Sequence, residues 1–526
     1  MSSNNSKNLP LREIPGGYGL PFLGPIADRY DFFYNHGADE FFRSRKEKYK
    51  SSVFRCNMPP GPFIAKNPKV VVLLDSVSFP ILFDVSKVEK RDIFAGTYMA
   101  STKFTGGYRV LSFLDPSEPK HATIKGLFIQ TLAKLHDRFL PLFSSISDDM
   151  FAQIEDEVGK TGESNYNDIN DVKAFEFLFR LYCNDVKPSD TKLGTSASKS
   201  ITTWLLPQIA PVTSLGLKWL PGFIEDLFLH TFPIPFFLVK SHYNNIYHAF
   251  INNLGPLLDD AEKVGLQRDE ACHNFVFFVC FNAYAAFKFF LPELMNYIGS
   301  AGEVLQLFPF VIKLWLADNQ SIKLWLEVSK FIFNYHIHIN CSMWFTCLQV
   351  LHLQLAEEIR RAVELEGGNI TINALNNMPL TESAIWEALR IEPPVRYQFA
   401  VAKEDITVQS HDASYLVKKG ETILGVQPFA TKDPKVFENP DKYIPDRFVG
   451  EGKKLIEYVY WSNGRGTDIP TANDKQCLGR NMIILLSRLH LAEFFLRYDT
   501  FSVEVSQYLS SSIVKFKSLS KASSST

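Results

Sequence analysis

Apolar residues recur at helical spacing along much of this chain and alternate in only a few places. Residues 37–50 and 136–160 repeat every third or fourth position, which predicts amphipathic helices, whereas residues 53–74 contain short alternating segments that predict strands. Residues 273–288 are apolar almost throughout, which predicts a buried central helix. The pattern favours a mainly α protein with small β-sheets.

Residues 204–239 are strongly apolar, yet they do not read as a membrane span. Repeated prolines and the charged residues Lys218, Glu225 and Asp226 interrupt the run. Three interpretations remain open for this stretch: a substrate entrance, a surface that rests on lipid, and ordinary core.

Composition narrows the class of protein. A chain of 526 residues that is 46% hydrophobic can bury a large core. A net charge of −2 argues against nucleic acid as a main partner. The seven cysteines are scattered without a disulfide pattern, which indicates a reducing compartment.

The N-terminus is short and polar, without a hydrophobic signal core, an Arg-rich transit segment or a transmembrane anchor. We therefore expect a cytoplasmic or peripherally membrane-associated protein. Residues 14–21 are rich in Pro and Gly and form a hinge within an N-terminal arm of residues 1–30. We expect residues 31–526 to form a single domain.

One cysteine near the C-terminus has good reason to be a metal ligand. Cys477 follows Lys475 by two positions, and Gly479 comes two positions later, where it would let the chain pass close to a flat ligand. An apolar helix is predicted from residue 481 onward. Cationic groups and a helix N-terminus favour the thiolate, which is a known axial ligand of haem iron. A small buried hydrophobe is the alternative for such a cysteine.

Two upstream elements carry further charged residues. Glu387 and Arg390 lie three positions apart on one helix, which Pro393 and the proline after it must end. A second arginine, Arg447, lies in a loop before the cysteine. A Glu-x-x-Arg pair alone is common and is usually a solvated ion pair.

In this order, the Glu-x-x-Arg pair, the Arg447 loop and Cys477-x-Gly479 resemble the haem-thiolate cytochrome P-450 superfamily. The resemblance implies the P-450 fold, with haem b between the central helix and the cysteine loop, and Cys477 as the axial ligand of the iron. It also implies that Glu387, Arg390 and Arg447 form a buried ion network that supports this loop.

Three basic residues are candidates for the haem propionates. The resemblance assigns this role to Lys475, and to His121 and Lys125, which are four positions apart on a helix that Pro119 would begin. Exposed surface charge is the alternative for these side chains.

The loop before the cysteine points to one branch of this superfamily. Twelve residues separate Gly464 from Cys477, where most members have four. The segments 461–464 and 473–477 resemble the plant subfamily that acts on fatty-acid hydroperoxides: allene oxide synthases, hydroperoxide lyases and divinyl ether synthases. The resemblance extends from residue 8 to residue 519, interrupted once, and is greatest to the branch handling 9- or both 9- and 13-hydroperoxides.

The central helix has no acid–threonine pair between residues 276 and 290, a pair that oxygen-activating relatives use. The resemblance places Asn282 over the haem, where its amide would orient the peroxide as donor and acceptor; a cap for a kinked helix is the alternative. It implies conversion of hydroperoxides to allene oxides in oxylipin biosynthesis, without O2 or a reductase. Ala285 and Ala286 replace the usual Gly-Gly, which would narrow the space above the haem.

Other functions remain open. On the same substrates, hydroperoxide lyase and divinyl ether synthase are the alternatives. A reductase-dependent monooxygenase would need NADPH, and an inactive haem or lipid carrier would be the product of a mis-spliced gene.

An internal segment at about residues 305–350 does not fit the resemblance. Joining its flanks would give one uninterrupted amphipathic helix. We interpret it as a translated intron or gene-model artefact, with a lipid-facing insertion as the alternative. His336 and His338 share one face of a possible strand, but two histidines are weak evidence for a metal. Sequencing the transcript across the junction tests this prediction.

Overall fold

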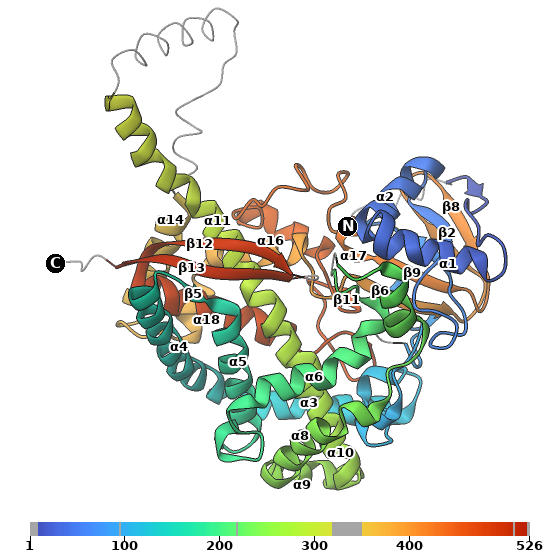
Figure 1. Ribbon diagram of the computed structural model, residues 1–526, viewed down its shortest axis with the longest axis horizontal. Coiled ribbons are helices and arrows are strands. Elements are labelled where there is room, and N and C mark those ends of the chain that lie inside the picture. Colours follow the sequence, from blue (N-terminus) through green and yellow to red (C-terminus); the bar gives the residue numbers. More distant parts are fainter. Residues whose placement is uncertain (1–8, 94–95, 217–218, 318–349, 509–510, 523–526) are drawn as a thin grey trace, which may run out of the picture.

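The computed structural model describes residues 9–93, 96–216, 219–317, 350–508 and 511–522. These residues form a mainly α protein with small sheets, so the predicted fold class is confirmed. Figure 1 shows the long helices gathered in one part of the molecule, with the largest sheet and the two N-terminal helices on the opposite side.

The largest sheet joins strands from distant parts of the chain in the order β2-β3-β9-β6-β4. β2 and β3 are antiparallel, whereas β3 pairs in parallel with β9 and sets Val71 opposite Ile423. The strands predicted within residues 53–74 are therefore confirmed. The five strands are β2 (Val53–Asn57), β3 (Lys69–Leu73), β4 (Val88–Glu89), β6 (Tyr397–Ala402) and β9 (Thr422–Val426).

Three smaller sheets complete the β structure of the described residues. Their orders are β1-β8-β7, β12-β13-β5 and β10-β11. Their strands are β1 (Leu11–Arg12), β5 (Ser164–Asn165), β7 (Ile406–Gln409), β8 (Ser414–Val417), β10 (Tyr460–Trp461), β11 (Gly464–Arg465), β12 (Tyr498–Tyr508) and β13 (Ser511–Lys521).

The helices bury most of the large aromatic side chains in one continuous core. The α-helices of the described residues are α1 (Leu23–Tyr30), α2 (Ala38–Tyr49), α3 (Pro119–Leu135), α4 (Phe139–Thr161), α5 (Tyr166–Tyr182), α6 (Ala197–Ile209), α7 (Gly222–Glu225), α8 (Lys240–Asn253), α9 (Gly255–Lys263), α10 (Arg268–Val276), α11 (Tyr284–Ala317), α14 (Val350–Glu364), α15 (Ile372–Asn376), α16 (Pro379–Ile391), α17 (Gln427–Ala430) and α18 (Arg480–Arg497).

The helix boundaries follow the signals in the sequence. α3 begins at Pro119, because a proline at the first helical position loses no hydrogen bond. α4 ends at Gly162, whose φ of 78° lies in the left-handed region that glycine tolerates. α16 ends at Ile391, two residues before Pro393, as predicted.

The central helix is the predicted buried one. α10, the π-helical turn η11 (Phe277–Ala283) and α11 form one run in which Arg268–Ala301 has the length and apolarity of a membrane span. Among the described residues, this is the one helical run with that length and apolarity. However, 72% of its most apolar stretch is buried inside the protein, which marks a core helix. π-turns inside helices often mark functional sites.

The N-terminal arm packs against the body. β1 pairs with β8, Ile14 is buried, and Gly16 forms a bridge with Arg55. The predicted hinge at residues 14–21 is irregular, but it is held in place by these contacts.

The unusual segment at residues 305–350 falls largely outside the described residues, since only its first part belongs to α11. At its far flank, α14 packs beside α11, where His352 Nε2 lies 2.8 Å from the carbonyl oxygen of Ile298. The two flanks are therefore not one helix in this chain. Whether residues 318–349 are an insertion stays a prediction.

Candidate active site

The cysteine loop lies between β11 and the start of α18. The backbone N–H of Cys477 donates to the carbonyl oxygen of Ser462 (3.0 Å), which fixes the cysteine against the β10–β11 turn. Gly479 is the N-cap of α18, and its N–H donates to Cys477 Sγ at 3.4 Å. The predicted helix after the cysteine is therefore confirmed, and its N-terminus faces the sulfur.

The side chains of Arg480, in α18, and Gln476 bind the backbone of the long stretch before the cysteine. Arg480 Nη1 donates to the carbonyl oxygens of Gly466 (2.6 Å) and Asp468, and Gln476 Nε2 donates to that of Arg465 (3.0 Å). No sequence pattern assigned a role to Arg480. Its side chain accounts for how a twelve-residue spacing can still form an ordered loop.

The charge state of Cys477 differs from the expectation. Burial raises the pKa of the Cys477 thiol, and this effect outweighs the Gly479 N–H, the Trp461 side chain and the positive charge of Lys125. The prediction that the loop itself favours the thiolate is thus wrong, because desolvation disfavours any buried charge. Coordination to a metal ion would deprotonate the thiol.

The predicted ion network is present and largely buried. Arg390 donates from Nε and Nη2 to the two oxygens of Glu387 at 2.7 and 2.8 Å, and Arg447 Nε lies 3.0 Å from both oxygens. Glu387 and Arg390 have 0% exposure, so this is not a solvated helix pair. One carboxylate and two guanidinium groups leave a net positive charge inside the protein.

The remaining donors of the network organise the loop that precedes the cysteine. Arg390 also donates to the carbonyl oxygens of Thr431, Pro440 and Lys442, and Arg447 donates to that of Glu438. A guanidinium carries five N–H donors in a fixed fork, which suits it to this task. The network therefore fixes the 438–447 backbone relative to α16.

Lys475 points away from the cysteine and toward the chain before α3. Its Nζ donates to the carbonyl oxygens of Leu111 (3.3 Å), Ser112 (2.9 Å) and Leu114. Burial lowers the pKa of Lys475 to about 7, although the nearby carboxylate of Asp115 opposes this shift.

A second buried lysine, Lys90, joins this group and was not predicted. Its Nζ donates to Asn463 Oδ1 beside the cysteine loop. Burial, reinforced by the positive charge of Lys475, lowers the pKa of Lys90 to about 7. No sequence pattern could have indicated it, because Lys90 reaches the loop from a different part of the chain.

His121 and Lys125 also face the cysteine loop, so they are not exposed surface charge. His121 Nδ1 lies 3.2 Å from the carbonyl oxygen of Ala472, and Lys125 Nζ contacts Asp474 Oδ1 at 2.6 Å. Burial, with the positive charges of Lys475 and Lys125, lowers the pKa of His121 to about 4. Both side chains contact the loop from α3, as their spacing predicts.

Asn282 lies in the π-turn η11 of the central helix. Its Nδ2 donates to Ser112 Oγ at 3.2 Å, and Lys475 Nζ binds the carbonyl oxygen of the same serine. The structure therefore brings Asn282 and Lys475 to one short segment, residues 111–114. Phe277 and Phe281 of the same turn stack at 4.6 Å, so the surroundings of Asn282 are mostly apolar.

These residues fit a haem. A cysteine thiolate as the protein ligand of the metal is one of the arrangements that hold haem iron. A Cβ added to Gly479 would meet only Cys477 Sγ, at 3.6 Å, which leaves this side of the loop free for a flat group. The buried Lys475 and Lys90 can carry positive charge suited to carboxylates, and the neutral imidazole of His121 can donate a hydrogen bond to one.

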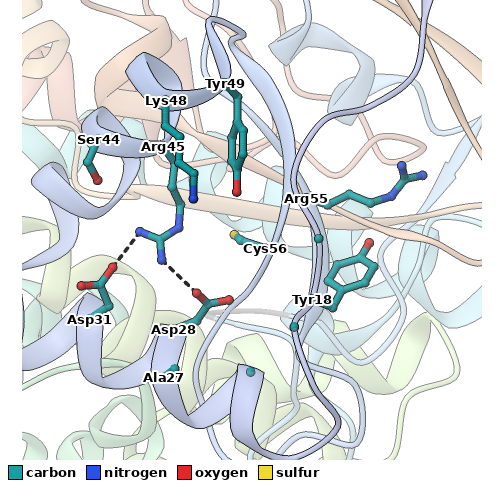
Figure 2. A pocket seen from close by; sticks show the side chains of 13 residues that line it. Tyr18, Ala27, Asp28, Asp31, Ser44, Arg45, Lys48, Tyr49, Arg55 and Cys56 are labelled. Carbon is teal, nitrogen blue, oxygen red and sulfur yellow. Dashed lines mark hydrogen bonds and ion pairs between the residues drawn. The ribbon is translucent and has the colours of Figure 1, made fainter.

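A separate cavity of about 420 Å³ lies in the N-terminal part and shares no residue with this site. Figure 2 shows that Arg45 points into it and pairs with Asp28 and Asp31, both at 2.8 Å. Its charged groups are largely satisfied by one another, so it is not part of the candidate active site.

Comparison with known proteins identifies the class first. Residues 351–514 match the family described as "Cytochrome P450". This stretch contains the Glu387 network and Cys477, and the fold is that of a cytochrome P450.

Full-length relatives then define the branch. The chain is 49% identical to "Allene oxide synthase 3" of Solanum lycopersicum, over 98% of this chain and 96% of the relative. It is 48% identical to an allene oxide synthase of Parthenium argentatum and 44% identical to a divinyl ether synthase of Nicotiana tabacum, with 98% of each chain covered. The chain belongs to the plant P450 family that contains allene oxide synthases and divinyl ether synthases.

Proposed function

We propose that this protein is a hydroperoxide dehydratase that converts polyunsaturated fatty-acid hydroperoxides, the 9-isomers and also 13-isomers, to allene oxides in oxylipin biosynthesis. The observation that carries the proposal is the full-length similarity to allene oxide synthases at 44–49% identity. The absence of an acid–threonine pair between residues 276 and 290 supports chemistry that starts from a peroxide.

The cofactor we propose is haem b, held by Cys477 as thiolate ligand. Lys475, Lys90 and His121 would bind its propionates, because they are buried basic groups with few carboxylates near them. Lys125 is paired with Asp474 and would instead hold the loop. When bound, the haem supplies the iron that cleaves the O–O bond homolytically.

The chain itself positions the substrate. The amide of Asn282 can donate to one peroxide oxygen and accept from the hydroxyl of the other, if it exchanges its bond to Ser112 for the substrate. Phe277 and Phe281 form an apolar wall that keeps water from the reactive carbon chain. Ala285 and Ala286, one turn further on, would restrict how that chain rearranges.

Divinyl ether synthase is the second candidate function. It is favoured by relatives of that name at 44% identity in Nicotiana tabacum and 42% in Capsicum annuum, both nearly full length. The two activities share the substrate and the first bond cleavage, so the protein's residues above the haem would decide between them.

Product identification tests this proposal. The haem-loaded protein is incubated without O2, NADPH or reductase with the 9- and 13-hydroperoxides of linoleic and linolenic acid. We expect an allene oxide, trapped as its α-ketol after hydrolysis. A divinyl ether would support the second candidate, short aldehydes would indicate a hydroperoxide lyase, and strict dependence on NADPH would indicate a monooxygenase. Haem binding without consumption of hydroperoxide would indicate a carrier.

We further propose peripheral association with membranes, where such substrates arise. Large apolar side chains are exposed on the N-terminal arm and α1, and on the chain around α7 and the π-turn η9 (Asp226–Thr231). Phe63, also exposed, stacks on Phe232 at 4.8 Å, and the ion pair between Arg29 and Asp226 joins α1 to η9. Sedimentation with phospholipid vesicles tests this: Phe223→Ser should release the protein, and unchanged sedimentation would contradict it.

A further inference from the structure

Outside the candidate site, four aromatic side chains stack in a row between the central helix and the surface. Trp204 of α6 stacks on Tyr243 of α8 at 5.4 Å, and Tyr243 stacks on His273 of α10 at 5.8 Å. Tyr247 also stacks on the imidazole of His273, at 4.6 Å. We call Trp204, Tyr243, His273 and Tyr247 the aromatic column. Figure 1 shows α6, α8 and α10 together at one end of the molecule.

The inner end of the column contacts the segment that carries Asn282. Trp204 is fully buried, and its ring meets Phe277 and Phe281 edge-on at 6.2 and 6.3 Å. Both phenylalanines belong to η11. Trp204 is therefore one aromatic layer away from the part of the helix that faces the substrate.

The middle of the column has a proton acceptor in place. The Tyr243 hydroxyl donates to His273 Nδ1 at 2.6 Å, and Asp269 Oδ1 lies 3.5 Å from His273 Nε2. Burial lowers the pKa of His273, so its imidazole is neutral at rest and can accept a proton. The adjacent carboxylate would stabilise the imidazolium that results. A phenol hydrogen-bonded to such a base loses an electron more easily, because its proton can move at the same time.

The outer end reaches solvent. The Tyr247 hydroxyl donates to Asp269 Oδ1 at 2.5 Å, and the Asp269 side chain is 49% exposed. A hydrogen bond between a buried tyrosine and a histidine would by itself be a structural contact. Here it lies within unbroken ring contacts that run from the pocket helix to an exposed carboxylate.

We propose that the aromatic column carries oxidising equivalents out of the pocket and so protects the protein from its own substrate. The inference depends on the proposed function. When a substrate radical leaves the pocket before returning its electron, one oxidising equivalent stays in the protein. Trp204 gives an electron that reduces this oxidising equivalent. The oxidised Trp204 ring then takes an electron from Tyr243, while the Tyr243 proton moves to His273 Nδ1.

The tyrosyl radical is then repaired from outside. Tyr247 gives an electron to the Tyr243 radical and its own phenolic proton to Asp269, and His273 returns the first proton to Tyr243. A small-molecule reductant in solvent, such as a thiol, supplies the last hydrogen atom to Tyr247. Asp269 then releases its proton to solvent, so all groups return to their starting states. Each step moves at most one electron and one proton.

The test uses the haem-loaded full chain and a saturated alkyl hydroperoxide, which has no double bond to rearrange and so leaves the oxidising equivalent behind. Samples are frozen after rapid mixing and examined by electron paramagnetic resonance. We expect a tyrosyl radical in the wild type, narrowed by ring-deuterated tyrosine. In Tyr243→Phe, which keeps the stacked ring, the signal should be lost, and the Soret band should bleach after several-fold fewer turnovers.

Tyr182→Phe is the matched control, since that buried hydroxyl has no hydrogen-bond partner in the structure; it should behave as wild type. Initial rates with linoleic acid hydroperoxide should be the same in all three proteins. Either of two results would overturn the inference. The first is a wild type that consumes the saturated alkyl hydroperoxide but forms no tyrosyl radical. The second is a Tyr243→Phe protein with the wild-type signal and bleaching. A wild type that consumes no fatty-acid hydroperoxide would instead contradict the proposed function.

Discussion

The two sides of the candidate site are built from different interactions. On one side, Glu387, Arg390 and Arg447 form a buried ion network in which nearly every donor has a partner. On the other side, the π-turn of the central helix offers one half-buried amide, Asn282, among phenylalanines. The network fixes the loop at residues 438–447 relative to α16, and the π-turn is where the substrate would be oriented. We therefore expect changes in the ion network to affect stability and haem binding, and changes in the π-turn to affect turnover and products.

The largest effect should follow Glu387→Gln. The substitution leaves two buried guanidinium groups without their counter-charge, which costs about 3–5 kcal/mol in the free energy of unfolding. Urea unfolding measures it, and haem content should fall in parallel. Glu457→Gln is the control, because Glu457 pairs with Arg465 at the surface and should cost about 1 kcal/mol or less. Equal losses in both variants would contradict the account.

Acid should also lower the free energy of unfolding, through a buried histidine of α18. Burial lowers the pKa of His490, in α18, to about 3, whereas the pKa of a histidine in the unfolded chain is about 6.5. Between these values the unfolded chain binds one more proton, so stability is full above pH 6.5 and is lost as pH falls toward 3. From pH 6.5 to 5 this amounts to about 2 kcal/mol. Urea midpoints at the two pH values should differ, and His490→Asn should remove part of the difference; an unchanged slope would contradict this assignment.

Asn282→Leu should slow turnover and leave stability nearly unchanged. Loss of an orienting hydrogen bond worth about 1–3 kcal/mol should slow hydroperoxide turnover roughly tenfold to a hundredfold. The free energy of unfolding should change by about 1 kcal/mol or less, because the amide makes a single bond to Ser112. Asn274→Leu is the control on the same helix: Asn274 bonds Leu111 N–H and the Glu270 carbonyl, so it should lose stability and keep its turnover per folded molecule. If Asn282→Leu turns over normally, the role of this amide is structural.

The smallest effect should come from Ala286→Gly. Removing one methyl group from the helix costs about 0.5–1 kcal/mol in stability and widens the space beside the substrate. We expect the proportions of α-ketol, divinyl ether and aldehyde to change while total consumption stays the same. Ala271→Gly, earlier in the same helical run, should have the wild-type product proportions. Identical products in both variants would remove Ala286 from the specificity of the site.

Much of this architecture could be predicted from local signals. The start of α3 at Pro119, the end of α16 before Pro393 and the buried central helix all follow from patterns within a few residues. The Glu387–Arg390–Arg447 network was identified by resemblance, and its burial could not have been inferred from a Glu-x-x-Arg pair alone.

Properties that depend on long-range contacts were missed. Lys90 reaches the cysteine loop from between β4 and α3, and no spacing connects it to Cys477. The direction of the Cys477 pKa shift was wrong because it depends on how deeply the fold buries the sulfur, whereas the sequence displays only the neighbouring charges. The partners of Lys475 in residues 111–114 were hidden for the same reason.

The most direct test of the account is Cys477→Ser, compared with Cys56→Ser, which changes a buried cysteine in the N-terminal part. Both proteins are loaded with haem and mixed with the 9-hydroperoxide of linoleic acid without O2 or NADPH. We predict that Cys56→Ser keeps the wild-type Soret band and rate, and that Cys477→Ser loses both. A Cys477→Ser protein with the wild-type Soret band and full peroxide consumption would contradict the claim that this sulfur holds the haem.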